Sequence, residues 1–163
     1  MSEAELTTTL LDNLQRGDLK KIARTENKKI HLRREIGNNS FRADIFITLQ
    51  KDEELVMNSK TSFIAIEVKI KDWKQGFYQA WRYNSFAEKS YLALYEPYSK
   101  NIDLNLFKDN NVGLIIFNEK TITIKNHPKR NTFTRNNLYS KNLRIKIWNS
   151  LGTIESIEPI FQK

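Results

Sequence analysis

The sequence predicts an α/β fold in which helices flank a central mixed sheet. Short runs rich in β-branched residues, which are typical of strands, alternate with segments whose apolar residues recur at helical spacing. Residues 63–70 form the clearest strand, and Leu6, Leu10 and Leu14 mark a helix near the N-terminus. The 163 residues contain no repeat, low-complexity tract or Pro/Gly/Ser-rich linker, so we expect one domain spanning residues 1–163.

Helix and strand signals follow one another along the chain. Ser2 and Glu5 are spaced as a capping box at the start of a helix over residues 3–15, and Asp72 begins a later helix with Gln75 three residues on. The apolar stripe of that later helix includes Trp81. Strands are predicted over residues 28–35, 40–49, 63–70, 90–95, 111–117 and 121–124, and further helices over residues 104–108 and 138–148.

Two charges interrupt the most apolar strand of the chain. Glu67 and Lys69 lie two residues apart, and side chains alternate across a strand, so both project from one face. Ile64, Ile66 and Val68 project from the other face. Buried charges have to be paired or to hold a metal ion. The two residues are therefore either a structural ion pair or part of a metal-dependent active site, with Glu67 as a ligand and Lys69 beside the scissile group.

Asp44 lies in the strand that precedes them. The polar segment 51–60 indicates a hairpin connection between the two strands. Adjacent antiparallel strands would place Asp44 and Glu67 on one face of the sheet, close enough to share an ion. Oxygen ligands suit a hard cation such as Mg²⁺ or Mn²⁺, which keeps several of its waters. The structural alternative is an ion pair between Asp44 and Arg42 or a nearby lysine.

These residues resemble the signature of the PD-(D/E)XK nuclease superfamily, which includes many restriction endonucleases, Holliday-junction resolvases and repair nucleases. Ala43 stands where the family name has proline. The resemblance covers about residues 1–117 and implies a restriction-endonuclease-like αβββαβ core. It rests on Asp44, on Glu67-Val68-Lys69 and on a helix containing Gln79-Ala80-Trp81-Arg82-Tyr83.

The resemblance also implies roles for the residues of the motif. Asp44 and Glu67 would hold the metal ion, and the backbone carbonyl of Val68 would be a further ligand. Lys69 would position the attacking water or stabilise the negative charge of the transition state. Burial lowers the pKa of a lysine, but two neighbouring acids oppose that effect, so we favour the stabilising role of Lys69 over a general base.

Two further residues, each with a rival, enter through the resemblance. Gln79 would orient Lys69 or a substrate phosphate, with Gln75 as the weaker alternative and a solvated helix face as the structural one. Family members often carry an acid on the first helix, and Glu5 fits that role as a catalytic residue and extra metal ligand. The capping box already explains Glu5 without catalysis, and Glu35 is the rival for the extra ligand.

The net charge of +8 and the pI near 9.6 predict an anionic partner, namely nucleic acid and more specifically DNA. The alternative is a solvated basic surface without a partner. The chain has no cysteine, which excludes disulfides, thiol catalysis and Cys-based zinc sites. No apolar stretch approaches a membrane span, and we expect a cytoplasmic location. The basic residues expected to contact phosphates are Lys71, Lys74, Arg82, Lys129 and Arg130.

Together these patterns predict a Mg²⁺- or Mn²⁺-dependent DNA endonuclease that hydrolyses phosphodiester bonds in DNA repair, recombination or defence against foreign DNA. The first alternative is a nuclease acting on RNA, or the catalytic subunit of a larger complex. The second is a nucleic-acid-binding module without catalysis. A homodimer would supply two active sites for cutting both strands of a duplex.

Overall fold

The strands of the computed structural model form one six-stranded mixed sheet, whose order follows the chain from β1 to β6. The structure describes residues 1–23, 29–38, 41–50, 61–131 and 138–151. Strand β2 pairs antiparallel with both β1 and β3, β3 to β5 are parallel, and β6 is antiparallel to β5. Their bounds are β1 Lys29–Asn38, β2 Phe41–Gln50, β3 Ser62–Lys69, β4 Lys89–Tyr95, β5 Gly113–Phe117 and β6 Ile122–Asn126.

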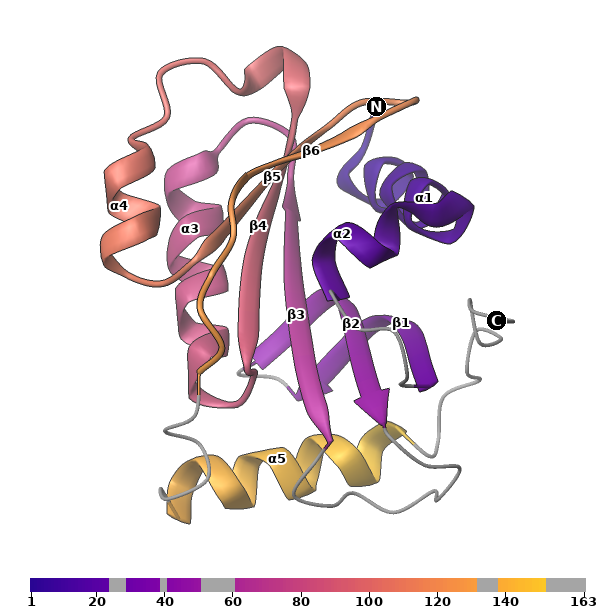
Figure 1. Cartoon of the computed structure of the whole chain (residues 1–163), viewed down its shortest axis with the longest axis vertical. Helices are drawn as coiled ribbons and strands as arrows, with labels where there is room; N and C mark the ends of the chain where they lie inside the picture. The colour runs from indigo at the N-terminus through magenta and orange to yellow at the C-terminus, as the bar shows by residue number, and fades with distance from the viewer. Residues whose placement is uncertain (24–28, 39–40, 51–60, 132–137, 152–163) are drawn as a thin grey trace.

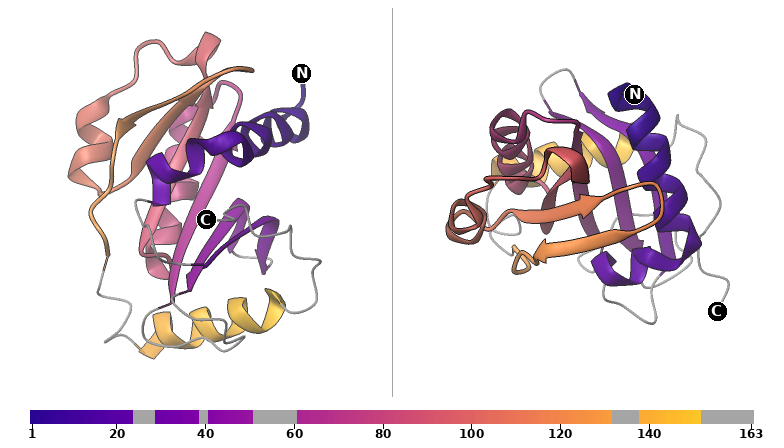
Figure 2. Two further views of the ribbon diagram at one scale, coloured as in Figure 1. Left: turned by 45° about the vertical axis from the view of Figure 1, so that its right-hand side comes forward. Right: turned by 90° about the horizontal axis from the view of Figure 1, so that it is seen from above.

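Helices cover both faces of this sheet. Figure 1 shows α1 and α2 on one side and α3 and α4 on the other, with α5 across the end that carries β1 and β2. The view from above in Figure 2 separates the same two layers. The bounds are α1 Glu3–Asn13, α2 Leu19–Ala23, α3 Trp73–Arg82, α4 Leu104–Asp109 and α5 Leu138–Leu151. In the described ranges, no helix is both long and apolar enough to span a bilayer.

The sheet divides the core between its two faces. One cluster packs the leucines of α1 and α2 against Ile64, Ile66 and Val68 of β3. On the opposite face, α5 packs against Phe46 and Phe63, while α3 and α4 pack over β4 and β5. The alternation predicted for β3 is thus confirmed, because its isoleucines and Val68 occupy one face and Phe63 the other.

The predicted elements agree with the observed ones to within a few residues. The capping box at Ser2 and Glu5 is present, and the Asp72 side chain accepts a hydrogen bond from the Gln75 amide at 3.1 Å. The sequence did not predict α2, which follows a π-helical turn containing Gly17. Gly17 has a φ of 129°, a backbone conformation that favours glycine, and there the chain changes direction. The proposed hairpin segment 51–60 lies outside the described residues.

Trp81 is exposed, contrary to the expectation from the sequence. The side of α3 that faces the sheet carries Gly76, Phe77 and Ala80, whereas Trp81 is 49% exposed. The small residues Gly76 and Ala80 allow the helix to approach the sheet closely. The buried stripe is therefore centred on them, and Trp81 lies on the outer surface.

A buried ion pair holds α5 in place. Arg144 of α5 contacts the Glu88 carboxylate at 2.9 Å and donates to the carbonyl oxygens of Phe86 at 2.7 Å and Thr61 at 3.1 Å. Glu88 also accepts from the Phe63 amide at 2.6 Å. Each charge is therefore paired and hydrogen-bonded, as burial requires.

Candidate active site

The candidate site begins where β2 and β3 stop pairing. The last pair of their ladder is Ile45 with Ile66, and the next position of the same register brings Asp44 opposite Glu67. There the Asp44 carboxylate, rather than a backbone carbonyl, accepts the hydrogen bond of the Val68 amide at 2.7 Å. The two strands therefore present two carboxylates at the point where their backbone ladder ends.

Glu67 is almost completely buried, with 3% of its surface exposed. Burial and the nearby Asp44 charge raise the pKa of Glu67 to about 7, although Tyr83 and Lys69 oppose that shift. The Tyr83 hydroxyl contacts both Glu67 Oε2 and the carbonyl oxygen of Arg42, the latter at 2.7 Å. One hydroxyl donates one hydrogen. That hydrogen is therefore shared between Glu67 Oε2 and the Arg42 carbonyl oxygen, both of which accept from the Tyr83 hydroxyl.

Lys69 is surrounded by carboxylates. Its Nζ lies 3.3 Å from Glu67 Oε1 and 3.6 Å from Glu3 Oε1. Burial lowers the pKa of Lys69, but the charges of Glu67, Glu3 and Asp44 outweigh burial, and the net shift is upward. Lys69 is therefore a cation at neutral pH, as its expected role in charge stabilisation requires.

Helix α3 covers the stem of Lys69 and the carboxyl of Glu67. A Cβ atom at Gly76 would lie 2.7 Å from Lys69 Cγ, so only glycine leaves room for the lysine stem. Tyr83 lies seven residues further on, two turns along the same helix face. Gln79 lies between them at helical spacing, and its Oε1 is buried with no hydrogen-bond partner in the described part of the chain. The structure thus places Gln79 on the helix face that covers the site.

The acid that the first helix brings to Lys69 is Glu3, not Glu5. The Glu5 carboxylate accepts the Ser2 amide of the capping box at 2.6 Å and lies at an exposed position. The bond with Ser2 also lowers the pKa of Glu5. The structure therefore assigns Glu5 to the helix cap. Glu35 lies in β1, and its side chain is outside the described part of the structure.

The donor set at the site suits a hard cation. Asp44 and Glu67 supply carboxylate oxygens, and the N–H and C=O of one strand residue point to the same side, so the Val68 carbonyl faces the Asp44 side as well. Within the described residues, no group of three His, Cys, Asp or Glu side chains is placed to hold a metal ion. Waters would have to complete the coordination, which is usual for Mg²⁺.

The basic residues expected to bind nucleic acid fall into two separate groups. Lys71, Lys74 and Arg82 are exposed on or beside α3, which covers the site. The Arg130 guanidinium donates to Ser62 Oγ at 3.2 Å, and Ser62 begins the strand that Lys69 ends. Arg130 is thus about 20 Å from the site along β3. The structure does not bring Arg130, or the adjacent Lys129, to the carboxylates.

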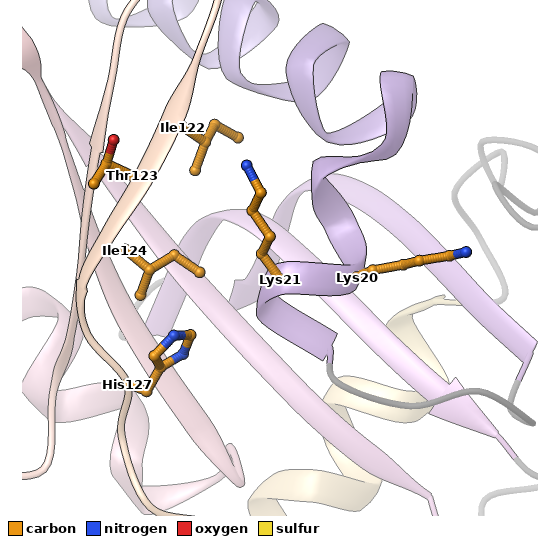
Figure 3. Close-up of a pocket in the computed structure, with 6 residues that line it drawn as sticks. All are labelled: Lys20, Lys21, Ile122, Thr123, Ile124 and His127. Atoms are coloured by element: carbon orange, nitrogen blue, oxygen red, sulfur yellow. The ribbon is translucent and has the colours of Figure 1, made fainter.

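A hollow of about 430 Å³ lies apart from these groups, between α2 and β6. Figure 3 shows Lys21 extending toward β6 in this hollow, while Lys20 points away from it. Lys21 pairs with Asp18 at 2.7 Å, so its charge is already compensated. None of the residues that line the hollow belongs to the carboxylate site. They are Lys20, Lys21, Ile122, Thr123, Ile124 and His127.

Comparisons with known proteins bear on the fold. No protein-family model matches the chain, and no curated protein matches it. Among solved structures, the chain is similar to the SPO1766 protein of unknown function from Silicibacter pomeroyi, with a TM-score of 0.50 and 13% sequence identity. The similarity covers 88% of this chain and 84% of that one. At this identity the likeness extends to the α/β fold alone.

Proposed function

We propose that this chain is a metal-dependent endonuclease that hydrolyses phosphodiester bonds of DNA, acting in repair, recombination or defence against foreign DNA in the cytoplasm. The observation that carries the proposal is the meeting of Asp44 and Glu67 where β2 and β3 separate, with Lys69 Nζ 3.3 Å from Glu67. The succession of three antiparallel strands, a helix and a parallel strand supports it. So does the net charge of +8, which favours a polyanionic substrate.

The residues of the site divide the chemistry among them. Asp44, Glu67 and the Val68 carbonyl would hold Mg²⁺ or Mn²⁺, which when bound activates water and neutralises developing charge. Lys69 stays protonated because three carboxylates raise its pKa, so it would stabilise the negative phosphoryl oxygens rather than accept a proton. Gln79, whose Oε1 has no partner among the described residues, would orient Lys69 or the phosphate.

The test is cleavage by the wild type and by Lys69→Met. Methionine keeps the stem that packs beneath Gly76 and removes the charge. Supercoiled plasmid, branched DNA and single-stranded RNA are incubated with Mg²⁺, with Mn²⁺ or with EDTA. We expect metal-dependent cutting of DNA by the wild type, loss of cutting in Lys69→Met, and full activity in Lys108→Met, which removes an exposed lysine of α4. Cutting that survives in Lys69→Met contradicts the proposed role.

One observation favours a second candidate, a nucleic-acid-binding module without catalysis. Both carboxylate oxygens of Glu67 already have protein partners, Lys69 and Tyr83, so the network is complete without an ion. Calorimetric titration with Mn²⁺ separates the candidates. Binding that Asp44→Asn abolishes supports the nuclease. No binding, together with no cutting of any substrate, supports the module. Cutting of RNA alone would redirect the proposal to an RNA nuclease, and sedimentation would test the predicted homodimer.

A further inference from the structure

The outer face of α3 carries two exposed aromatic rings. Tyr78 is 61% exposed and Trp81 is 49% exposed. They lie three residues apart, so they are neighbours on one side of the helix. Phe77 and Ala80 pack into the core, and the Phe77 ring also contacts the inner edge of the Tyr78 ring. Adjacent exposed aromatic rings of this size are costly in water and favour an apolar or π-faced partner.

The rings lie between positive charges. Lys74 is four residues before Tyr78, and Arg82 is four residues after it, so all three share the outer face with Trp81. Residues 73–85 contain no aspartate or glutamate. The only acid at the start of this helix is Asp72, and its carboxylate caps the helix. The face therefore combines exposed π surface with the positive charges of Lys74 and Arg82, and it is complementary to a polyanion that carries aromatic groups.

We propose that this outer face of α3, defined by Lys74, Tyr78, Trp81 and Arg82, binds single-stranded nucleic acid, with unpaired bases stacked on the two rings. Stacking of bases on aromatic side chains, with cations along the backbone, is how single strands are held without sequence preference. A duplex hides the faces of its bases, so the rings of a convex helix cannot reach them. From Lys74 to Arg82 the helix rises about 12 Å, the length of about three stacked nucleotides.

The opposite sides of α3 would then serve one substrate. The inner side covers the stem of Lys69 at Gly76 and contacts Glu67 through Tyr83. The outer side would hold the strand, and exposed Lys71 lies between Lys69 and the start of the helix. This inference rests on the proposed nuclease function for its substrate class, and it predicts a preference for single-stranded or frayed regions.

Binding is measured in EDTA, so that no cutting occurs. A fluorescein-labelled DNA strand of about 15 nucleotides is titrated alone and annealed to its complement, with anisotropy as the readout. We expect Trp81→Ala to weaken single-strand binding by about 5- to 100-fold and duplex binding much less. Trp81→Phe retains a π-face and should bind nearly as the wild type does. Tyr98→Ala, which removes a ring that is 48% exposed elsewhere, should have no effect.

The salt dependence of binding distinguishes the contribution of the aromatic rings from that of the cations. Lys74→Gln should reduce the slope of log affinity against log salt by about 0.7, whereas Trp81→Ala should leave that slope unchanged. The inference is overturned if Trp81→Ala binds the single strand as the wild type does, if it loses single strand and duplex equally, or if the wild type binds no single strand.

The experiments test the proposed nuclease function and this binding inference independently of each other. Trp81-dependent binding by a wild type that cuts nothing retains the inference and removes the nuclease. Metal-dependent cutting together with unchanged binding by Trp81→Ala removes the inference and retains the nuclease.

Discussion

The stem of Lys69 lies directly beneath Gly76, and a methyl group at Gly76 would come within 2.7 Å of Lys69 Cγ and 2.5 Å of a methyl of Leu92. This contact links the close approach of α3 to the position of the lysine ammonium among its carboxylates. This contact explains why a glycine, which has a low helix propensity, lies in the middle of α3.

Gly76→Ala tests this relationship. Alanine favours the helix by about 1 kcal/mol, while the forced contacts cost about 1–3 kcal/mol. The free energy of unfolding should therefore fall by no more than about 2 kcal/mol. Cleavage should fall by at least about tenfold, because a displaced Lys69 no longer meets the phosphate. Urea unfolding measures the effect on stability, and plasmid cleavage measures the effect on activity. Asn105→Ala, at an exposed position of α4, is the control. A variant with full activity would show that Lys69 need not lie where the structure places it.

Tyr83→Phe removes the hydroxyl between Glu67 and the Arg42 carbonyl. Both partners are then left without that hydrogen bond, and we expect a loss of about 1–3 kcal/mol in the free energy of unfolding. The bond from Tyr83 lowers the pKa of Glu67, so its loss should also raise that pKa. Chemical denaturation at several pH values measures both. Tyr78→Phe, which alters an exposed tyrosine, should change stability by less than about 0.5 kcal/mol. Equal effects of the two changes would contradict the buried hydrogen bond.

Glu67 makes stability depend on pH. Its pKa is raised from 4.5 to about 7, so between these values the folded chain binds more protons than the unfolded chain. The contribution of Glu67 to stability is therefore complete below about pH 4.5 and is lost as pH rises through about 7, by roughly 3 kcal/mol. Unfolding of wild type and Glu67→Gln from about pH 5 to about pH 8 measures it. The wild type should lose stability relative to the variant as pH rises. Parallel curves would mean that Glu67 is ionised throughout.

Substitutions of Arg144 and Glu88 should have strongly non-additive effects on the free energy of unfolding. Arg144→Met leaves the Glu88 carboxylate buried without its cation and should cost about 3–5 kcal/mol. Adding Glu88→Gln removes the unpaired charge and keeps an acceptor for the Phe63 amide, so the double variant should recover part of that loss. A double-mutant cycle by urea unfolding gives the coupling energy. Additive losses would contradict a direct pair.

Much of the fold could be predicted because apolar runs and turn signals are local. The strand around Glu67 is apolar on both sides, and its observed bounds, Ser62–Lys69, differ from the predicted range by one residue at each end. The meeting of Asp44 with Glu67 also followed from local patterns, since alternation and antiparallel pairing place them on one face. These signals need no knowledge of how distant elements pack.

The features that the sequence did not predict depend on packing between distant elements. The apolar spacing of α3 is compatible with a stripe that includes Trp81, and only the close approach at Gly76 and Ala80 decides which side is buried. Glu3 was missed because an acid in the first turn of a helix is already explained by the helix dipole. Nothing local shows that this helix passes over the end of β3. The same holds for Arg144, whose partner lies 56 residues away.

The amide of Val68 donates to the side chain of Asp44 and not to a backbone carbonyl of β2. The chemical shift of this one amide hydrogen, and its exchange with solvent, should therefore respond to the charge on Asp44, whereas the other amides of β3 respond to the integrity of the sheet. A nitrogen-15 spectrum of the free protein thus contains a resonance that reports directly on the carboxylate. An ion or a phosphate arriving at the site would move that peak without any labelled substrate.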